Sequence, residues 1–179
     1  MPIFVAFLRG INIGSHLVKK GQLQEIFASL GFINVSAFKQ SGNVILETDS
    51  GDSEKIRRMI EEELCKILGY EVAVFVRTIA QLKSIIDLDP FKGQDKEGNS
   101  FLVTMLANPH PEAFSSELPL TIPKSTAQVI LVKGAEVFSV THGGGEGALP
   151  NPFVEKKLKV KATTRNINIL EQIVEKYSM

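Results

Sequence analysis

The chain has 179 residues, 44% of them hydrophobic, which is enough apolar material for a buried core and excludes a chain that is disordered by composition. Its 20 basic and 20 acidic side chains balance, so no global field draws the molecule to nucleic acid or to an acidic membrane. The single cysteine, Cys65, excludes an internal disulfide and suits a reducing compartment, and no apolar run approaches the length of a membrane span. We therefore expect a cytoplasmic protein without a membrane partner.

The first part of the chain alternates strand and helix patterns. Short apolar or β-branched runs bounded by turn residues predict four strands, at residues 3–8, 35–38, 44–47 and 71–77. Apolar residues at helical spacing predict helices over 23–30 and 56–67, and Asp52 can cap the second of these. The order βαββαβ is the ferredoxin-like signature, so we expect a ferredoxin-like subdomain over residues 1–77.

A connecting helix and loop are expected over residues 78–99. Thr78 and Gln81 have the spacing of a capping box at the start of this helix. The loop that follows is polar but has no low-complexity linker, so the two parts of the chain should pack tightly.

The second part, residues 100–179, is predicted to be another α+β subdomain. The expected elements are a strand at 101–107, a helix beginning at Pro111, a hairpin of 128–132 with 136–140, a helix that Asn151 and Pro152 cap and begin, and a last helix capped by Thr163 or Thr164. Both parts hold a strand, a helix and a hairpin, so a structural duplication is a hypothesis, although no residue-level repeat is visible. The fold class is therefore α+β, with a ferredoxin-like unit packed on a second α/β unit, whose relation to the first is a hypothesis.

The first candidate site is the stretch LRGINIGS after the first strand. Backbone N–H groups in a strand-to-helix turn can face an anion, and the candidate residues are Arg9, Gly10, Asn12 and Gly14. The stretch matches neither of the glycine-rich phosphate motifs, GxxxxGK[ST] and GxGxxG. The alternative is that its glycines only allow the chain to turn.

The second candidate is the glycine-rich stretch after His142. It contains Gly143, Gly144, Gly145 and Gly147, which are more glycines than one tight turn needs. The functional interpretation is a phosphate-binding loop or a lid, and the alternative is a mobile loop. His142 beside it is the one histidine placed to act as an acid or base, and it is the candidate catalytic residue.

Two further stretches carry polar side chains at the ends of predicted elements. Thr163, Thr164, Arg165 and Asn166 would suit a phosphate or carboxylate at a helix N-terminus, although ordinary capping explains either threonine. Gln40, Ser41, Gly42 and Asn43 can present amide and hydroxyl groups to a ligand, although turn chemistry alone explains them.

Other chemistry has little support in the sequence. No histidine has a second histidine or a cysteine at metal-ligand spacing, so we predict no structural zinc, and the sequence names no cofactor. The acidic run at 61–63 and the basic run at 156–161 are typical of solvated helix faces. The basic run has no interleaved aromatic residues, so it is weak support for nucleic-acid binding. A nucleic-acid partner is therefore disfavoured, but the sequence does not exclude it.

The combination of motifs resembles one family. Residues 8–14, 40–44, 151–158 and 162–166 are similar, in this order, to the small, mostly bacterial "LRGINVGG" proteins, a domain of unknown function. The chain departs from the family pattern at Ser15, over 17–22 and at Ile167, where the family has a glycine, a Val-Pro-Met stretch and a tryptophan. The resemblance implies an α+β fold of ferredoxin-like pieces and carries no activity or cofactor.

Three functions are compatible with these observations. The leading hypothesis is a binding protein whose cleft between the subdomains takes a small anionic ligand, phosphorylated or nucleotide-like, with Arg9 and Arg165 as the anion contacts. The second is an enzyme acting on such a ligand, with His142 as proton-transfer group. The third is an RNA-binding or protein-interaction module. The sequence defines neither the ligand nor the oligomeric state.

Overall fold

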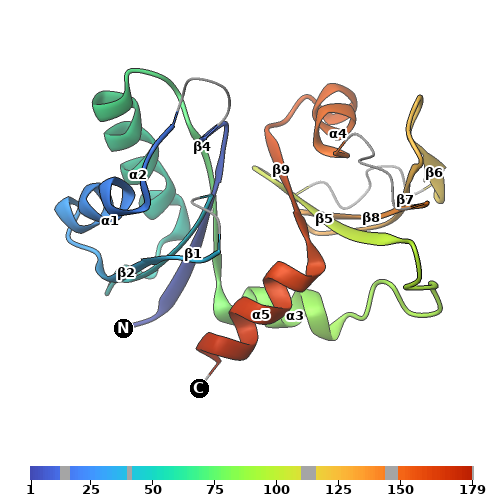
Figure 1. The fold of residues 1–179 in the computed structure, drawn as a ribbon, viewed down its shortest axis with the longest axis horizontal. Helices are drawn as coiled ribbons and strands as arrows, with labels where there is room; N and C mark the ends of the chain where they lie inside the picture. Colours follow the sequence, from blue (N-terminus) through green and yellow to red (C-terminus); the bar gives the residue numbers. More distant parts are fainter. Residues whose placement is uncertain (13–16, 40–41, 110–115, 144–148, 179) are drawn as a thin grey trace. The chain divides into compact units, whose positions relative to one another are not determined.

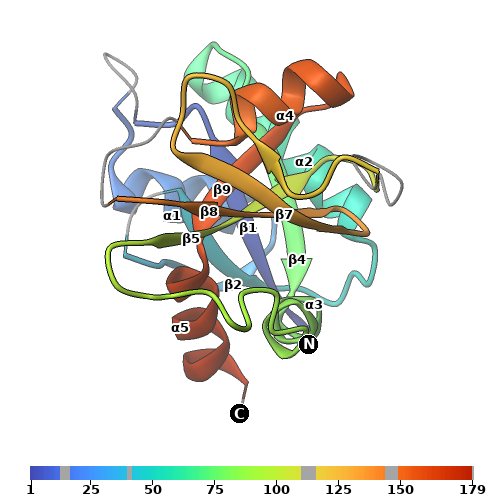
Figure 2. The same ribbon diagram turned by 90° about the vertical axis from the view of Figure 1, so that its right-hand side faces the viewer.

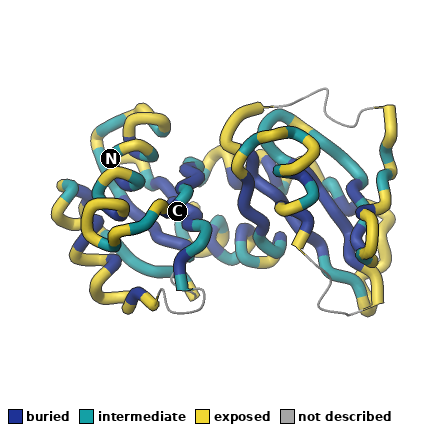
Figure 3. Tube along the Cα trace, turned by 90° about the horizontal axis from the view of Figure 1, so that it is seen from above, coloured by how far each residue is buried: buried dark blue, intermediate teal, exposed yellow. Residues whose placement is uncertain are grey.

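The computed structural model describes residues 1–12, 17–39, 42–109, 116–143 and 149–178, and its elements form two compact units (Figure 1). Unit 1 comprises Met1–Leu82 and Ile173–Met179, and unit 2 comprises Lys83–Gln172. Buried residues follow the strands, while exposed residues gather in loops and on the outer sides of helices (Figure 3). No helix in the described ranges is long and apolar enough to cross a membrane.

Unit 1 is a four-stranded antiparallel sheet covered on one face by two helices. Its elements are β1 (Ile3–Arg9), α1 (Lys20–Ser29), β2 (Ile33–Ala37), β3 (Asn43–Glu47), α2 (Ser53–Leu68) and β4 (Ala73–Thr78), followed by α3 (Ile79–Asp87) at the boundary with unit 2. The strand order is β2-β3-β1-β4, with every neighbouring pair antiparallel. The predicted βαββαβ order of elements is confirmed.

The core of unit 1 explains the continuous apolar run of β1. Phe4, Ala6 and Leu8 belong to the cluster that α1 and α2 cover with Phe27 and Ile60. The alternate side chains Val5 and Phe7, on the other face of the sheet, are also fully buried. A strand buried on both faces has no polar positions to alternate with, as its sequence predicted.

The predicted helix caps of unit 1 are present. The Asp52 carboxylate accepts the N–H groups of Glu54 and Lys55, both at 3.0 Å, and α2 ends at Gly69, whose φ is +78°. Thr78 and Gln81 bond reciprocally at the start of α3: the Thr78 N–H donates to Gln81 Oε1 at 2.9 Å, and the Gln81 N–H donates to Thr78 Oγ1 at 3.1 Å. Both caps satisfy backbone donors that a helix N-terminus leaves unpaired.

Unit 2 contains a five-stranded antiparallel sheet with α4 on one face (Figure 2). Its elements are β5 (Ser100–Leu106), β6 (Leu120–Thr121), β7 (Ala127–Lys133), β8 (Glu136–Thr141), α4 (Asn151–Leu158), β9 (Ala162–Asn166) and α5 (Ile167–Tyr177), whose last turns belong to unit 1. The strand order is β6-β7-β8-β5-β9. Val154 of α4 packs with Leu106, Val137 and Ala162 of the sheet. The helix predicted at Pro111 lies outside the described residues.

The two sheets repeat one topology. If β5, β7, β8 and β9 are matched with β1, β2, β3 and β4, both sheets read 2-3-1-4. Register agrees, because Val5 pairs with Arg77 in unit 1 and Val103 pairs with Arg165 in unit 2. The hypothesis of a structural duplication is thus supported at the level of strand order and register.

Two predicted caps in unit 2 are wrong. Thr163 and Thr164 lie inside β9, where they pair with Met105 and Thr104, and α5 begins only after Asn166. β-branched side chains fit a strand paired on β5 better than a helix start, and this tertiary pairing decides the outcome.

Asn151 is also no cap. It lies within α4, whose N-cap is Pro150 without a side-chain hydrogen bond. Its side chain is buried and accepts a hydrogen bond from Thr164 Oγ1 at 3.3 Å, so its polar group serves the core and not the helix end.

Candidate functional site

Two of the predicted stretches lie side by side at one end of the sheet in unit 1. Phe7 pairs with Asn43 across β1 and β3, and the Leu8 N–H donates to the Gly42 carbonyl at 2.8 Å. Arg9 is two residues beyond Phe7 and therefore lies on the same sheet face as Asn43. Gly14, Gln40 and Ser41, which belong to the same predicted site, lie outside the described residues.

Several of these residues shape the turn. Gly10 and Asn12 have φ values of +80° and +58°, in the region that favours glycine and asparagine. The Asn12 Oδ1 accepts the Val18 N–H at 2.5 Å and so closes the loop before α1. The Asn43 Nδ2 donates to the Phe38 carbonyl at 3.4 Å across the β2–β3 connection. These contacts support the interpretation that Gly10, Asn12 and Asn43 build the turns, and a ligand role for them stays a prediction.

In unit 2, the stretch 163–166 is divided between the two faces of β9. Thr163 and Arg165 point to the face opposite α4, while Thr164 and Asn166 alternate to the other. Thr164 is buried and its hydroxyl lies 2.8 Å from that of Thr104. The Asn166 Oδ1 accepts the Asn168 N–H at 3.0 Å at the start of α5. The four residues therefore do not form one ligand-facing cluster as the helix-terminus prediction required.

Arg165 is the titratable side chain of this stretch. Its Nη1 donates to Thr163 Oγ1 at 2.8 Å and to the Thr164 carbonyl at 2.9 Å, which fixes the guanidinium against its own strand. Burial lowers the pKa of Arg165 to about 10, because removing the guanidinium from water disfavours its charged form. Burial also lowers the pKa of Arg9 in unit 1. Both arginines thus carry their positive charge at a cost in solvation free energy.

His142 lies at the end of β8, exposed to solvent. Its Nδ1 is 3.1 Å from the Asn99 Oδ1, and its backbone N–H donates to the Thr126 carbonyl at 3.2 Å. With Nδ1 donating to the amide oxygen, the ring would keep Nε2 as a proton acceptor. Gly143 follows with a φ of +83°, and Gly144 and Gly145 lie outside the described residues.

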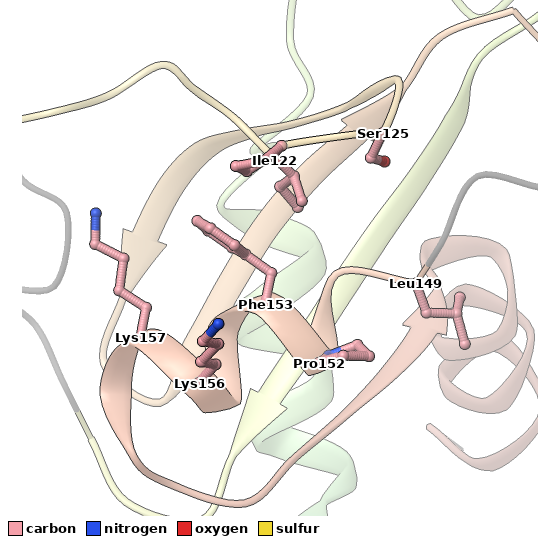
Figure 4. A pocket seen from close by; sticks show the side chains of 8 residues that line it. Ile122, Ser125, Leu149, Pro152, Phe153, Lys156 and Lys157 are labelled. Atoms are coloured by element: carbon pink, nitrogen blue, oxygen red, sulfur yellow. The ribbon is translucent and has the colours of Figure 1, made fainter.

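A groove that the sequence did not predict runs beside α4 in unit 2 (Figure 4). It has a volume of about 530 Å³ and is lined by Ile122, Pro123, Ser125, Leu149, Pro152, Phe153, Lys156 and Lys157. Figure 4 shows the Phe153 ring extending from α4 toward Ile122. The sequence signalled this site only through the basic run that begins at Lys156. The apolar lining residues of the groove come from segments about 30 positions apart, so no local pattern contains them.

A family model described as "Protein of unknown function (DUF1697)" matches residues 1–138. The chain belongs to this family. A comparison with curated proteins gave no match. Among solved structures, the chain is similar to the conserved bacterial protein SP0830 from Streptococcus pneumoniae, with 16% sequence identity and a TM-score of 0.70 over 100% of this chain and 99% of that chain. At this identity the likeness shows the α+β fold alone.

Proposed function

We propose that this protein binds a small anionic ligand, phosphorylated or nucleotide-like, and that Arg165 contacts the anion. The supporting observation is the desolvated guanidinium of Arg165, whose pKa is lowered to about 10 while the neighbouring Thr163 hydroxyl holds it in place. A fixed arginine matches the geometry of phosphate or carboxylate oxygens and can bond them in pairs.

The solvation free energy that the Arg165 guanidinium loses on burial favours a bound anion. A cation withdrawn from water loses solvation, and an anion brought next to it restores favourable charge interaction in a medium where that interaction is strong. Burial also lowers the pKa of Arg9 in unit 1, on the sheet face that carries Asn43, and Arg9 is the second candidate contact.

A thermal-shift screen tests this proposal with nucleotides, sugar phosphates, coenzymes and inorganic phosphate. A ligand present at about 100 times its Kd stabilises the native state by about 2.7 kcal/mol, so the unfolding temperature should rise with ligand concentration. The variant R165Q should lose the shift while keeping the far-UV circular dichroism of the parent. R58Q, the same change at an exposed arginine of α2, is the matched control and should keep it.

Two results would overturn the proposal. An undiminished shift in R165Q would remove Arg165 from the site, and the same comparison with R9Q would test the second candidate. No binding by calorimetry for any member of the panel would remove the small anionic ligand itself.

An enzyme acting on such a ligand is the second candidate, favoured by the contact between His142 Nδ1 and Asn99 Oδ1. This contact would orient the imidazole for proton transfer from Nε2. Once a ligand is known, H142Q should abolish turnover without changing ligand affinity, and N99A should reduce it. Unchanged turnover in H142Q would exclude this role.

A further inference from the structure

The groove beside α4 has the size of a small-molecule site and is independent of Arg165. Its volume of about 530 Å³ falls within the range of ligand pockets, roughly 300–1,000 Å³. Every described residue that lines it belongs to unit 2.

Most of the lining is apolar. Phe153 is half-buried and packs on the core under α4. Leu149 is 55% exposed, a large value for a leucine beside Pro152 and Phe153. A contiguous apolar lining that stays open to solvent marks a surface suited to an apolar partner.

The charged groups of the groove are both cationic. Lys157 forms an ion pair with Glu117, with 2.5 Å between Nζ and Oε2, so its charge is largely compensated. Lys156, one residue earlier on α4, has no ion pair or hydrogen bond with any residue in the described ranges. No aspartate or glutamate is among the lining residues that the structure describes. Within these residues, the groove joins an apolar surface to one cation, Lys156, that has no ion-pair partner.

We propose that this groove binds a small amphipathic anion, an apolar chain that ends in a carboxylate. The chain would lie along Phe153 and Leu149, and the carboxylate would pair with the Lys156 ammonium. The ligand class differs from the phosphorylated ligand of Arg165, and the two sites can be tested separately.

Calorimetry with a matched series of ligands tests both halves of this proposal. Hexanoate, octanoate and decanoate, used below the concentrations at which they form micelles, should bind about fourfold more tightly for each added methylene, as burial of apolar surface requires. Octanoate should bind more tightly than octanol, and octyltrimethylammonium should bind most weakly. Equal affinities for the three head groups would overturn the charge assignment.

Variants place the ligand in the groove. K156Q should weaken octanoate about threefold and leave octanol unchanged, a ratio within the range of exposed ion pairs. L149A should weaken both ligands by about fivefold through lost apolar contact. The matched controls are K133Q, at an exposed lysine of β7, and L88A, at a leucine that is 41% exposed; both should bind as the parent does.

Outcomes for the two sites are distinguishable. Octanoate binding that persists in R165Q and falls in K156Q and L149A supports the groove whatever the phosphate screen gives. Octanoate binding that is unchanged in L149A overturns the placement. Binding of an acidic peptide in the absence of octanoate binding would assign the groove to a protein partner and overturn the small-molecule proposal.

Discussion

Replacing Thr164 by valine should destabilise unit 2 through the loss of a buried hydroxyl. Thr164 Oγ1 lies 2.8 Å from Thr104 Oγ1 and donates to Asn151 Oδ1 at 3.3 Å, and all three side chains are buried. The valine keeps the branched shape but removes two hydrogen bonds, each of which contributes about 1 kcal/mol. It also leaves two buried polar atoms without these partners, so we expect the free energy of unfolding to fall by about 2–4 kcal/mol.

Urea unfolding followed by far-UV circular dichroism measures this loss, because the chain has no tryptophan. With a slope of about 2 kcal/mol per molar urea, the midpoint should fall by about 1–2 M. T141V is the matched control, since Thr141 is equally buried in the same sheet but its Oγ1 has no hydrogen-bond partner among the described residues. Removing an unpaired buried hydroxyl should leave stability unchanged or raise it. Equal losses in T164V and T141V would refute the reasoning.

Two further predictions concern α2. D52A removes the acceptor of the Glu54 and Lys55 N–H groups and should lower the free energy of unfolding by about 1 kcal/mol, which D52S should largely restore; a loss that D52S does not restore would contradict capping. E54Q tests pH dependence, because the hydrogen bond from Arg57 lowers the pKa of Glu54. That stabilisation is present above the unfolded pKa of about 4.3 and is lost as pH falls through the lower folded value, so E54Q should be less stable than the parent by under about 1 kcal/mol at pH 7, and the difference should shrink as pH falls below about 4.3. A difference that does not shrink with falling pH would exclude the ionised pair as its cause.

Local signals in the sequence identified the helix caps of unit 1 and the apolar run of β1. The caps at Asp52 and Thr78 use side chains within three residues of the helix start, so their patterns are visible in a short window. The apolar run of β1 is likewise continuous in the sequence, and it indicated burial on both faces. These features gave the element order of unit 1.

Features that depend on distant residues were missed. β9 is a strand because it pairs with β5, about 60 residues earlier, and no local pattern contains that pairing. The groove joins residues of the β6–β7 segment to α4, and its shape exists only after folding. The duplication was invisible as a repeat because the offset between equivalent residues is not constant: it is 98 from Val5 to Val103 and 88 from Arg77 to Arg165.

The duplicated sheets differ in the length of the helix that follows their third strand. α2 has 16 residues and spans about 24 Å, whereas α4 has eight and spans about 12 Å. The shorter helix covers less of its sheet, and the groove lies beside this helix. One strand order can therefore carry helices of different length without any change in the hydrogen-bonded strand pairs beneath them.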